Sequence, residues 1–332
     1  MTDLLSLLPD ELETLFTDMG QPRYRAKQVF AWLHRGIRDF DDMTDLPAAL
    51  RKQLRETCVL RIPEEIRRQH SADGTEKILW RLHDGETVES VLMRYEAGRS
   101  ICLSTQAGCR QHCVFCASSA GGLVRNLTAG EILGQLLHCK EPVSRAVLMG
   151  IGEPLDNFDN TIRFLRLLSH PHGRNMSPRH LSLSTCGLVP EIDKLADSAL
   201  PVTLSVSLHA PDDETRRKLM PAAKLYPLDK LLQSAKRFFE KTGRRISYEY
   251  IMLDGINDSA EQARTLAKLL RRHPAHINLI PYNPVEGKPY KPPPADTIAA
   301  FARQLPGYDV TIRRTLGSEI EAACGQLRQT GH

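Results

Sequence analysis

Two hydrophobic patterns alternate along the chain from residue 101 onward. Short apolar runs are typical of buried strands, and apolar residues that recur every three or four positions are typical of helices covering a sheet. We expect strands at 101–105, 145–150, 180–185, 202–208, 246–253 and 276–281, with a last strand at 308–314. We expect helices at 129–140, 158–169, 189–198, 227–242, 259–272 and 296–304. This alternation predicts a parallel sheet, wound right-handedly and curved into a full or partial barrel.

The first hundred residues follow other patterns. Residues 1 to about 60 have helical spacing, which is interrupted near Pro22 and Pro47. Two strand-like segments, 76–82 and 86–95, are joined by Asp-Gly, a dipeptide that favours a hairpin turn. We therefore divide the chain into a helical accessory domain (1–60), a β-hairpin extension (61–100), a barrel (101–315) and a C-terminal tail (316–332).

Polar residues and glycines follow five of the expected barrel strands. They are Cys102 with the segment after it, Gly150, Gly152 and Glu153, then Ser184, then Ser207 and His209, and finally Asn283. Serine and glycine after a strand are usually turn residues, and a lone histidine is more often structural than a ligand. Functional groups of a barrel gather at the carboxyl ends of its strands. The repetition at five strand ends therefore predicts one polar ligand across the barrel mouth.

Composition and charge narrow the class of protein. No apolar run approaches the roughly 20 residues that span a bilayer. The N-terminus has acidic residues where a secretory signal has basic ones, so we expect a cytoplasmic protein, with no need for more than a monomer. The net charge of +4 is mild, but residues 21–38 hold five Arg or Lys and no acid. This segment is either a solvated helix face, with Arg23, Lys27, His34 and Arg38 beside an apolar stripe, or a contact for nucleic-acid phosphates.

The segment "CLSTQAGCRQHCVFC", residues 102–116, concentrates four of the eight cysteines. Cytosolic thiols stay reduced, so this cluster points to metal or redox chemistry rather than to disulfides. Cys109, Cys113 and Cys116 have the spacing C-x3-C-x2-C. A structural zinc usually takes four protein ligands, and this set supplies three unless His112 or Cys102 joins it. Three thiolates suit a [4Fe-4S] cluster with one iron open to a substrate, and we favour the cluster.

Six ordered motifs extend this pattern over most of the chain. They are "CLSTQAGCRQHCVFC", "GGLVRNLTAGEI", "LMGIGEPLDN", "LSVSLHAPDDETR", "INLIPYNP" and "EIEAACGQL". Together they resemble the RlmN family, radical SAM enzymes that methylate carbon 2 of adenosine in RNA. The resemblance runs from about residue 89 to 327, with a small departure at Glu319, where relatives often have Asp. It implies an α/β fold, a radical SAM partial (β/α)6 barrel with a small N-terminal helical accessory domain and a β-hairpin extension.

The resemblance also implies a chemistry that needs two thiols. Carbon 2 of adenine is electron-poor and cannot attack a sulfonium methyl group, whereas a cysteine thiolate can. By motif match, Cys324 takes a methyl group from one S-adenosylmethionine (SAM). A second SAM, cleaved at the [4Fe-4S] cluster, gives a radical that activates this methyl group, which then joins the adenine in a covalent protein–RNA adduct. Cys102 releases the product by forming a transient disulfide with Cys324.

The same match assigns the remaining site residues. Glu89 is the proton acceptor, although a hairpin carboxylate that faces solvent is the alternative for this position. Gly152 and Glu153 bind the methionine amino end of SAM. Its ribose, adenine and carboxylate are contacted by Ser184, Ser207, Leu208, His209 and Asn283.

The family implies both the substrates and the partners. It modifies an adenosine at the peptidyl-transferase centre of 23S rRNA, and many members modify the adenosine beside the anticodon in tRNA. The expected electron donor is a flavodoxin or ferredoxin.

Two alternative functions stay open. A Cfr-type enzyme methylates carbon 8, although Pro154 favours carbon 2 because Cfr-type chains often have Ala there. A zinc-stabilised RNA-binding module without catalysis is the alternative from a different class.

Overall fold

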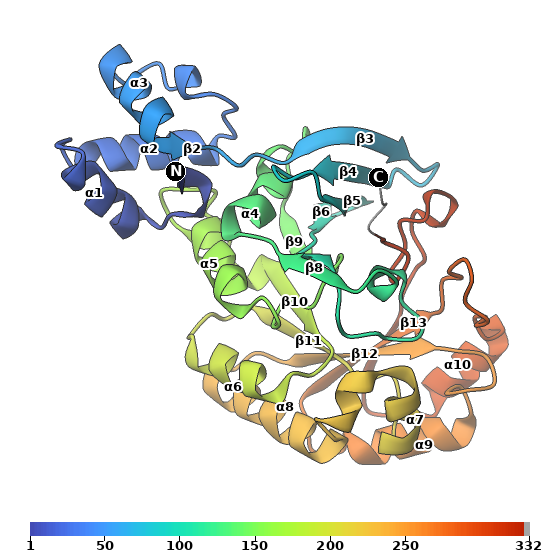
Figure 1. Ribbon diagram of the computed structural model, residues 1–332. Coiled ribbons are helices and arrows are strands. Elements are labelled where there is room, and N and C mark those ends of the chain that lie inside the picture. Colours follow the sequence, from blue (N-terminus) through green and yellow to red (C-terminus); the bar gives the residue numbers. More distant parts are fainter. Residues whose placement is uncertain (329–332) are drawn as a thin grey trace.

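The computed structural model describes residues 1–328, and its centre is a ten-stranded sheet (Figure 1). Seven neighbouring strands are parallel: β6 (Gly98–Cys102), β9 (Arg145–Leu148), β10 (Leu181–Thr185), β11 (Thr203–Ser207), β12 (Ile246–Met252), β13 (Ala275–Pro281) and β14 (Asp309–Ile312). β5 (Thr87–Tyr95), β4 (Glu76–Arg81) and β3 (Glu64–His70) continue the sheet beyond β6 as antiparallel strands. Since β14 and β3 lie at opposite ends of the strand order, the described strands form an open, partial barrel.

Helices follow the parallel strands and cover the outer face of the sheet (Figure 1). They are α4 (Ala129–Leu137), α5 (Phe158–Ser169), α6 (Val189–Asp197), α7 (Asp213–Leu219), α8 (Leu228–Thr242), α9 (Ala260–Leu269) and α10 (Ala295–Arg303). α4 begins at a capping box, in which the Thr128 hydroxyl accepts from the Glu131 amide and the Glu131 carboxylate accepts from the Thr128 amide. The apolar faces of sheet and helices form one large core.

A helical lobe at the N-terminus packs against α4 and α5 (Figure 1). It contains α1 (Pro9–Asp18), α2 (Tyr24–His34), α3 (Ala48–Thr57) and a short parallel pair of strands, β1 (Thr2–Asp3) and β2 (Cys58–Val59). The predicted apolar stripe of α2 is buried, but so is His34, which is only 5% exposed. Our placement of His34 beside the stripe, among solvated or phosphate-binding cations, was therefore wrong.

Several elements differ from the expected ones. β3 joins β4 and β5, so the predicted hairpin is a three-stranded meander. The first barrel strand ends at Cys102, and residues 103–105 lead instead into a separate ribbon of β7 (Gln106–Gly108) and β8 (Leu123–Asn126). Short 3-10 helices lie at Leu4–Ser6, Phe40–Asp42, Ala117–Ser119, Pro178–His180, Pro221–Lys224 and Ser318–Ile320.

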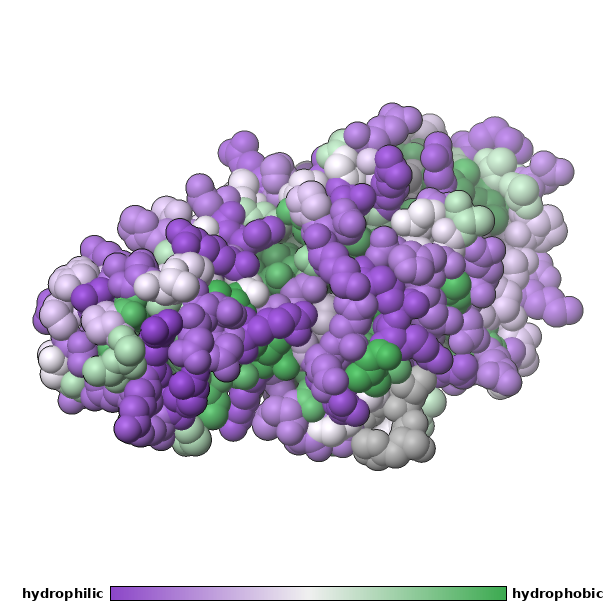
Figure 2. Space-filling model, turned by 90° about the horizontal axis from the view of Figure 1, so that it is seen from above, coloured by the Kyte–Doolittle hydropathy of each residue, from purple (hydrophilic) through white to green (hydrophobic). Residues whose placement is uncertain are grey.

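The surface is mainly hydrophilic on the face seen in Figure 2, where apolar residues form small patches between polar ones. Among residues 1–328, no helix combines the length and apolar character that a membrane crossing requires.

Candidate active site

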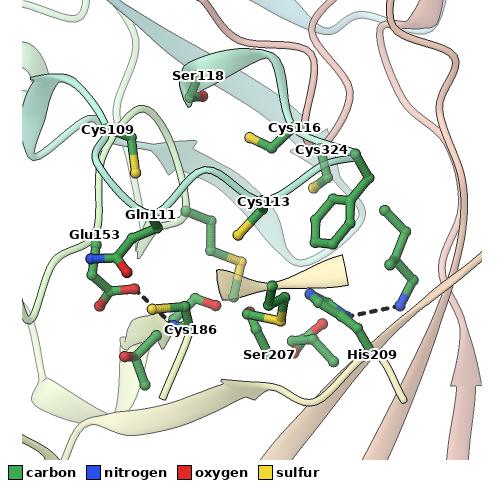
Figure 3. A pocket seen from close by; sticks show the side chains of 18 of the residues that line it. Cys109, Gln111, Cys113, Cys116, Ser118, Glu153, Cys186, Ser207, His209 and Cys324 are labelled. Carbon is green, nitrogen blue, oxygen red and sulfur yellow. Dashed lines mark hydrogen bonds between the residues drawn. The ribbon is translucent and has the colours of Figure 1, made fainter. Parts of the chain in front are cut away.

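The cysteine loop follows β7 and covers the mouth of the barrel. Backbone hydrogen bonds fix it at both ends, from the Cys109 amide to the Gly122 carbonyl (2.8 Å) and from the Val114 amide to the Leu219 carbonyl (3.1 Å). Cys109, Cys113 and Cys116 line one pocket, which is shown in Figure 3. Burial raises the pKa of the Cys109 thiol to about 12 and also raises the pKa of the other two thiols. The raised pKa values favour the protonated thiols. A bound metal would instead favour the thiolates, because a coordinating thiol is deprotonated.

The three thiols fit an iron–sulfur cluster better than a single ion. Within residues 1–328, no group of three or more His, Cys, Asp or Glu side chains is close enough together to bind one metal ion. A structural zinc requires such a group, with ligand atoms roughly 2.0–2.3 Å from a common centre. In a cubane cluster each thiolate binds a different iron, so the sulfur atoms surround a larger volume. Three thiols lining one pocket match that donor set.

A glycine-rich turn after β9 forms the next wall of this pocket. Gly152 has a φ of +105°, and a β-carbon there would lie 2.6 Å from the Cβ atom of Gln106, so only glycine fits. The Glu153 carboxylate is buried and accepts hydrogen bonds from the amides of Cys186 (2.7 Å) and Leu155 (3.0 Å). Burial raises its pKa, and the amide donors partly oppose that effect. The amino group of a ligand would supply the positive charge that a buried carboxylate requires.

Ser184, Ser207 and His209 line the same pocket at the ends of β10 and β11. His209 Nδ1 accepts from the Ile251 amide (3.0 Å), which places the ring proton on Nε2. Burial lowers the pKa of His209 to about 3, and the positive charge of Arg216 adds to this effect, so the ring is neutral. Leu208 differs from its neighbours because its side chain lies in the main core, which leaves only its backbone for a ligand.

Asn283 lies outside the pocket wall. Its side-chain amide donates to the Cys324 carbonyl (3.1 Å) and accepts from the Thr315 hydroxyl (3.1 Å). In this conformation Asn283 therefore fixes the C-terminal tail rather than facing the space available for SAM.

Cys102 and Cys324 lie together although 222 positions separate them in sequence. Both thiols are reduced and line a small cavity beside the main pocket, which Cys324 also lines. Burial raises the pKa of Cys102 to about 12, and a negative charge on Cys324 adds to this effect. Arg313, which sequence reasoning missed, lines both cavities, and the charge of a Cys324 thiolate is the largest cause of its raised pKa. Sequence reasoning placed it inside the last expected strand, 308–314, whereas β14 (Asp309–Ile312) ends just before it.

Glu89 lies on β5 with 1% of its surface exposed, so the solvent-facing alternative was wrong. One carboxylate oxygen, Oε1, lies 3.2 Å from Nζ of Lys77, and the other, Oε2, accepts from the backbone amide of Arg328 (3.1 Å). The carboxylate therefore touches the tail four residues after Cys324. Sequence reasoning missed Lys77, because its segment read only as a strand.

Arg216, on α7, is a further residue that sequence reasoning missed. Its fully buried guanidinium donates to four carbonyls, those of Cys186 (2.8 Å), Tyr226 (3.1 Å), Leu208 (3.2 Å) and Ser207 (3.3 Å). It thereby connects the segments after β10 and β11 beneath the pocket.

Comparisons with known proteins agree with this geometry. Residues 103–267 match the model of the radical SAM superfamily, and residues 2–60 match that of the ribosomal RNA large subunit methyltransferase N-terminal domain. A protein of Symbiobacterium thermophilum named "Probable dual-specificity RNA methyltransferase RlmN" is 50% identical over 96% of this chain and 89% of its own length. A protein of the same name from Alkaliphilus oremlandii is 47% identical over 98% of this chain and 97% of its own length. The crystal structure of a radical SAM methyltransferase from Sphaerobacter thermophilus superimposes with a TM-score of 0.95, at 41% identity, over 98% of this chain and 99% of that one.

These relationships extend over both the helical lobe and the barrel, and they identify the cofactors as a [4Fe-4S] cluster and SAM. The chain belongs to the RlmN family of radical SAM RNA methyltransferases.

Proposed function

We propose that the protein methylates carbon 2 of an adenosine in RNA, at the peptidyl-transferase centre of 23S rRNA and beside the anticodon of tRNA. Cys324 is the methyl carrier in this proposal, Cys102 is the resolving thiol and Glu89 is the proton acceptor. The observation that carries it is the cavity shared by Cys102 and Cys324, next to the pocket of the three cluster cysteines. A zinc-stabilised binding module has no use for this second pair of thiols.

Different residues of the pocket would bind the cluster and the different parts of SAM. Cys109, Cys113 and Cys116 would bind the cluster, which when present supplies the electron that cleaves SAM. Gly152 and Glu153 would receive the methionine amino group, and Ser184, Ser207 and His209 would contact the rest of the molecule. Leu208 contributes through its backbone, and Asn283 becomes available to SAM when it releases the Cys324 carbonyl.

The two thiols act in sequence. The Cys324 thiolate, beside the Arg313 cation, attacks the methyl carbon of SAM and displaces the neutral thioether. The S-methyl carbon gives up one hydrogen atom to the radical derived from the second SAM and joins adenine; Glu89 then removes the ring proton, and the unpaired electron of the adduct would return to the cluster. The Cys102 thiolate then attacks the Cys324 sulfur, so that a disulfide forms as the bond from that sulfur to the RNA-linked carbon breaks. That carbon keeps the electron pair of the broken bond and takes a proton from solvent to become the methyl group. Two electrons from a thiol reductant restore both cysteines.

The cellular setting of the proposal rests on the family resemblance. A flavodoxin or ferredoxin donates the electron, and the chain acts as a monomer in the cytoplasm.

Nucleoside mass spectrometry of RNA treated with the anaerobically reconstituted holoenzyme, SAM and a reductant tests the proposal. A 23S rRNA fragment and bulk tRNA are assayed separately. Finding 2-methyladenosine supports it and shows which RNA is used, whereas 8-methyladenosine assigns the chain to the Cfr type. An intact cluster that gives no methylated adenosine on either RNA overturns it.

Cysteine variants test the assigned roles. Cys324→Ala is expected to abolish the product, and Cys102→Ala is expected to accumulate a covalent protein–RNA adduct. Cys139→Ala is the matched control, because Cys139 lies half-buried against the main core. A Cys102 variant that turns over at the control rate would contradict the resolving role.

A further inference from the structure

A buried ion pair connects two strands of the antiparallel meander. Lys77 on β4 is 5% exposed and Glu89 on β5 is 1% exposed, and their charged atoms lie 3.2 Å apart. A buried carboxylate without a partner is costly and tends to bind a proton. A carboxyl group that already holds a proton cannot accept another from a substrate.

The strand register fixes this pairing. Glu89 lies opposite Leu79, and Lys77 lies opposite Val91, so the two charged residues are diagonal neighbours across the β4–β5 ladder. Residues two apart on a strand project from the same face, and long side chains reach diagonal partners. The lysine can therefore reach the carboxylate from within the sheet.

The two oxygens of Glu89 have different environments. Oε1 faces Lys77 Nζ, which also donates to the Glu321 carbonyl at 3.4 Å. Oε2 accepts from the Arg328 amide and thus faces the tail that carries Cys324. The Arg328 side chain itself turns away, to Glu286 and Glu321. Among the described contacts, the Glu89 carboxylate meets one charged group, the Lys77 ammonium, while the charged side chains of Arg328 and Glu321 on the tail pair with each other.

We propose that Lys77 is a positioning residue for the methyl transfer: its ammonium pairs with Oε1 of Glu89 and holds the carboxylate in place, so that Oε2 accepts the adenine ring proton. This inference rests on the proposed function, in which Glu89 is the proton acceptor. In that step the ring C–H bond of the adduct breaks, its electron pair stays with the purine, the proton bonds to Oε2, and the unpaired electron of the adduct would return to the [4Fe-4S] cluster that supplied one electron for SAM cleavage. Lys77 keeps its own protons, and the Arg328 amide must first leave Oε2.

A purely structural role for Lys77 predicts different effects of its replacement. A lysine that only tied β5 and the tail together would affect all steps that depend on the tail, at every pH. A lysine that acts through the Glu89 carboxylate affects the step after adduct formation, and most strongly at low pH, where proton transfer to a carboxylate is slowest. The pH profile and the adduct therefore separate the two roles.

The experiment compares Lys77→Met, Lys77→Arg and wild-type holoenzyme in anaerobic turnover with the RNA that wild type methylates. Lys140→Met is the matched control, because Lys140 forms an exposed ion pair with Glu65 of the same meander. For Lys77→Met we expect kcat at pH 7 to fall about 10- to 100-fold, since general base catalysis contributes roughly 100- to 10,000-fold. We also expect the KM for RNA to be nearly unchanged and covalent adduct to accumulate. The acid limb of the pH–rate profile should move to higher pH, because the carboxylate loses its cationic partner.

The charge-conserving variant Lys77→Arg should retain most of the activity, and Lys140→Met should match wild type. A folded Lys77→Met enzyme with the wild-type pH profile and no excess adduct overturns the inference. If that variant does not fold, Lys77→Gln, which keeps a hydrogen-bond donor without the charge, is judged by the same profile. A wild-type enzyme that forms neither adduct nor product refutes the proposed function instead, so the two failures are distinguishable.

Discussion

At the scale of single residues, His34 shows how burial changes the role that a sequence suggests. Its ring packs on Phe30 with centroids 4.4 Å apart, and its Nδ1 atom has no hydrogen-bond partner in the described chain. Burial lowers its pKa to about 4, and the positive charges of His170 and Arg174 lower it further. A neutral, buried ring cannot bind phosphate, so only the exposed cations of this segment, such as Arg23 and Lys27, remain candidates for RNA contact.

This burial predicts a pH-dependent stability. In the unfolded chain His34 binds a proton near pH 6.5, whereas in the folded protein it does so only near pH 4. Between these values the unfolded state binds more protons, so the free energy of unfolding decreases as the pH falls. We expect His34→Phe to remove about 2 kcal/mol of the stability that wild type loses between pH 7.5 and pH 5. Urea unfolding of wild type and His34→Phe at both pH values measures this difference in the free energy of unfolding.

Exposed His180 provides the control for this comparison. His180→Phe should leave the pH dependence as it is in wild type. Equal losses of stability in wild type and His34→Phe would show that His34 is not the group responsible.

At the scale of elements, periodicity located the barrel but not the pieces that complete its mouth. Every barrel strand and its covering helix was expected within a few residues of its observed position, because burial on one or both faces imposes a regular apolar pattern. Several elements escaped, and β3 and α7 show why. β3, "EEIRRQH", is mostly polar and bulged at Glu65, and α7, "DETRRKL", has seven residues and no apolar stripe. Tertiary pairing, rather than local pattern, determines both.

Contacts between distant segments also determine parts of the site that local sequence patterns do not reveal. Family motifs singled out Cys109, Cys113, Cys116 and Cys324, which line one pocket, whereas Lys77, Arg216 and Arg313 emerged only with the structure. Each acts through a contact between segments far apart in sequence. A single sequence holds no signal for such a contact.

Arg216 carries the prediction for α7. Its guanidinium donates to carbonyls at the ends of two barrel strands. We expect Arg216→Met to lower the free energy of unfolding by about 2–4 kcal/mol, because buried carbonyls lose their donors. SAM affinity should also fall, since the segments with Ser184 and Ser207 lose their connection.

The adjacent exposed Arg217 gives a matched control on the same helix. Arg217→Met should change neither stability nor SAM affinity by more than experimental error. Thermal unfolding and equilibrium SAM binding provide the measurements, and wild-type values for Arg216→Met in both would contradict this role.

At the scale of the whole molecule, the site exists only because three distant segments meet. The cysteine loop, the meander β3–β5 and the described part of the C-terminal tail enclose Cys324. The turn between β3 and β4 binds the tail directly. Asp73 accepts from the Gly317 amide (2.8 Å), and the Ala72 amide donates to Glu319 (2.5 Å). Glu319 thus reaches the turn and holds the tail to it.

This arrangement predicts that Asp73 controls the delivery of Cys324 without touching the cofactor pocket. Asp73→Ala removes a charge-assisted hydrogen bond, worth about 1.5–3 kcal/mol, so amide exchange in residues 317–328 should accelerate about tenfold or more. Methylation of Cys324 and RNA turnover should fall, because a tail that samples more conformations presents its thiol less often. Reductive SAM cleavage should be preserved, since none of the pocket-lining residues changes. The exposed Asp254→Ala is the control. Faster exchange with undiminished turnover would show that anchoring the tail at this turn is not required for the chemistry, and the argument that the meander organises the site would then rest on Glu89 and Lys77 alone.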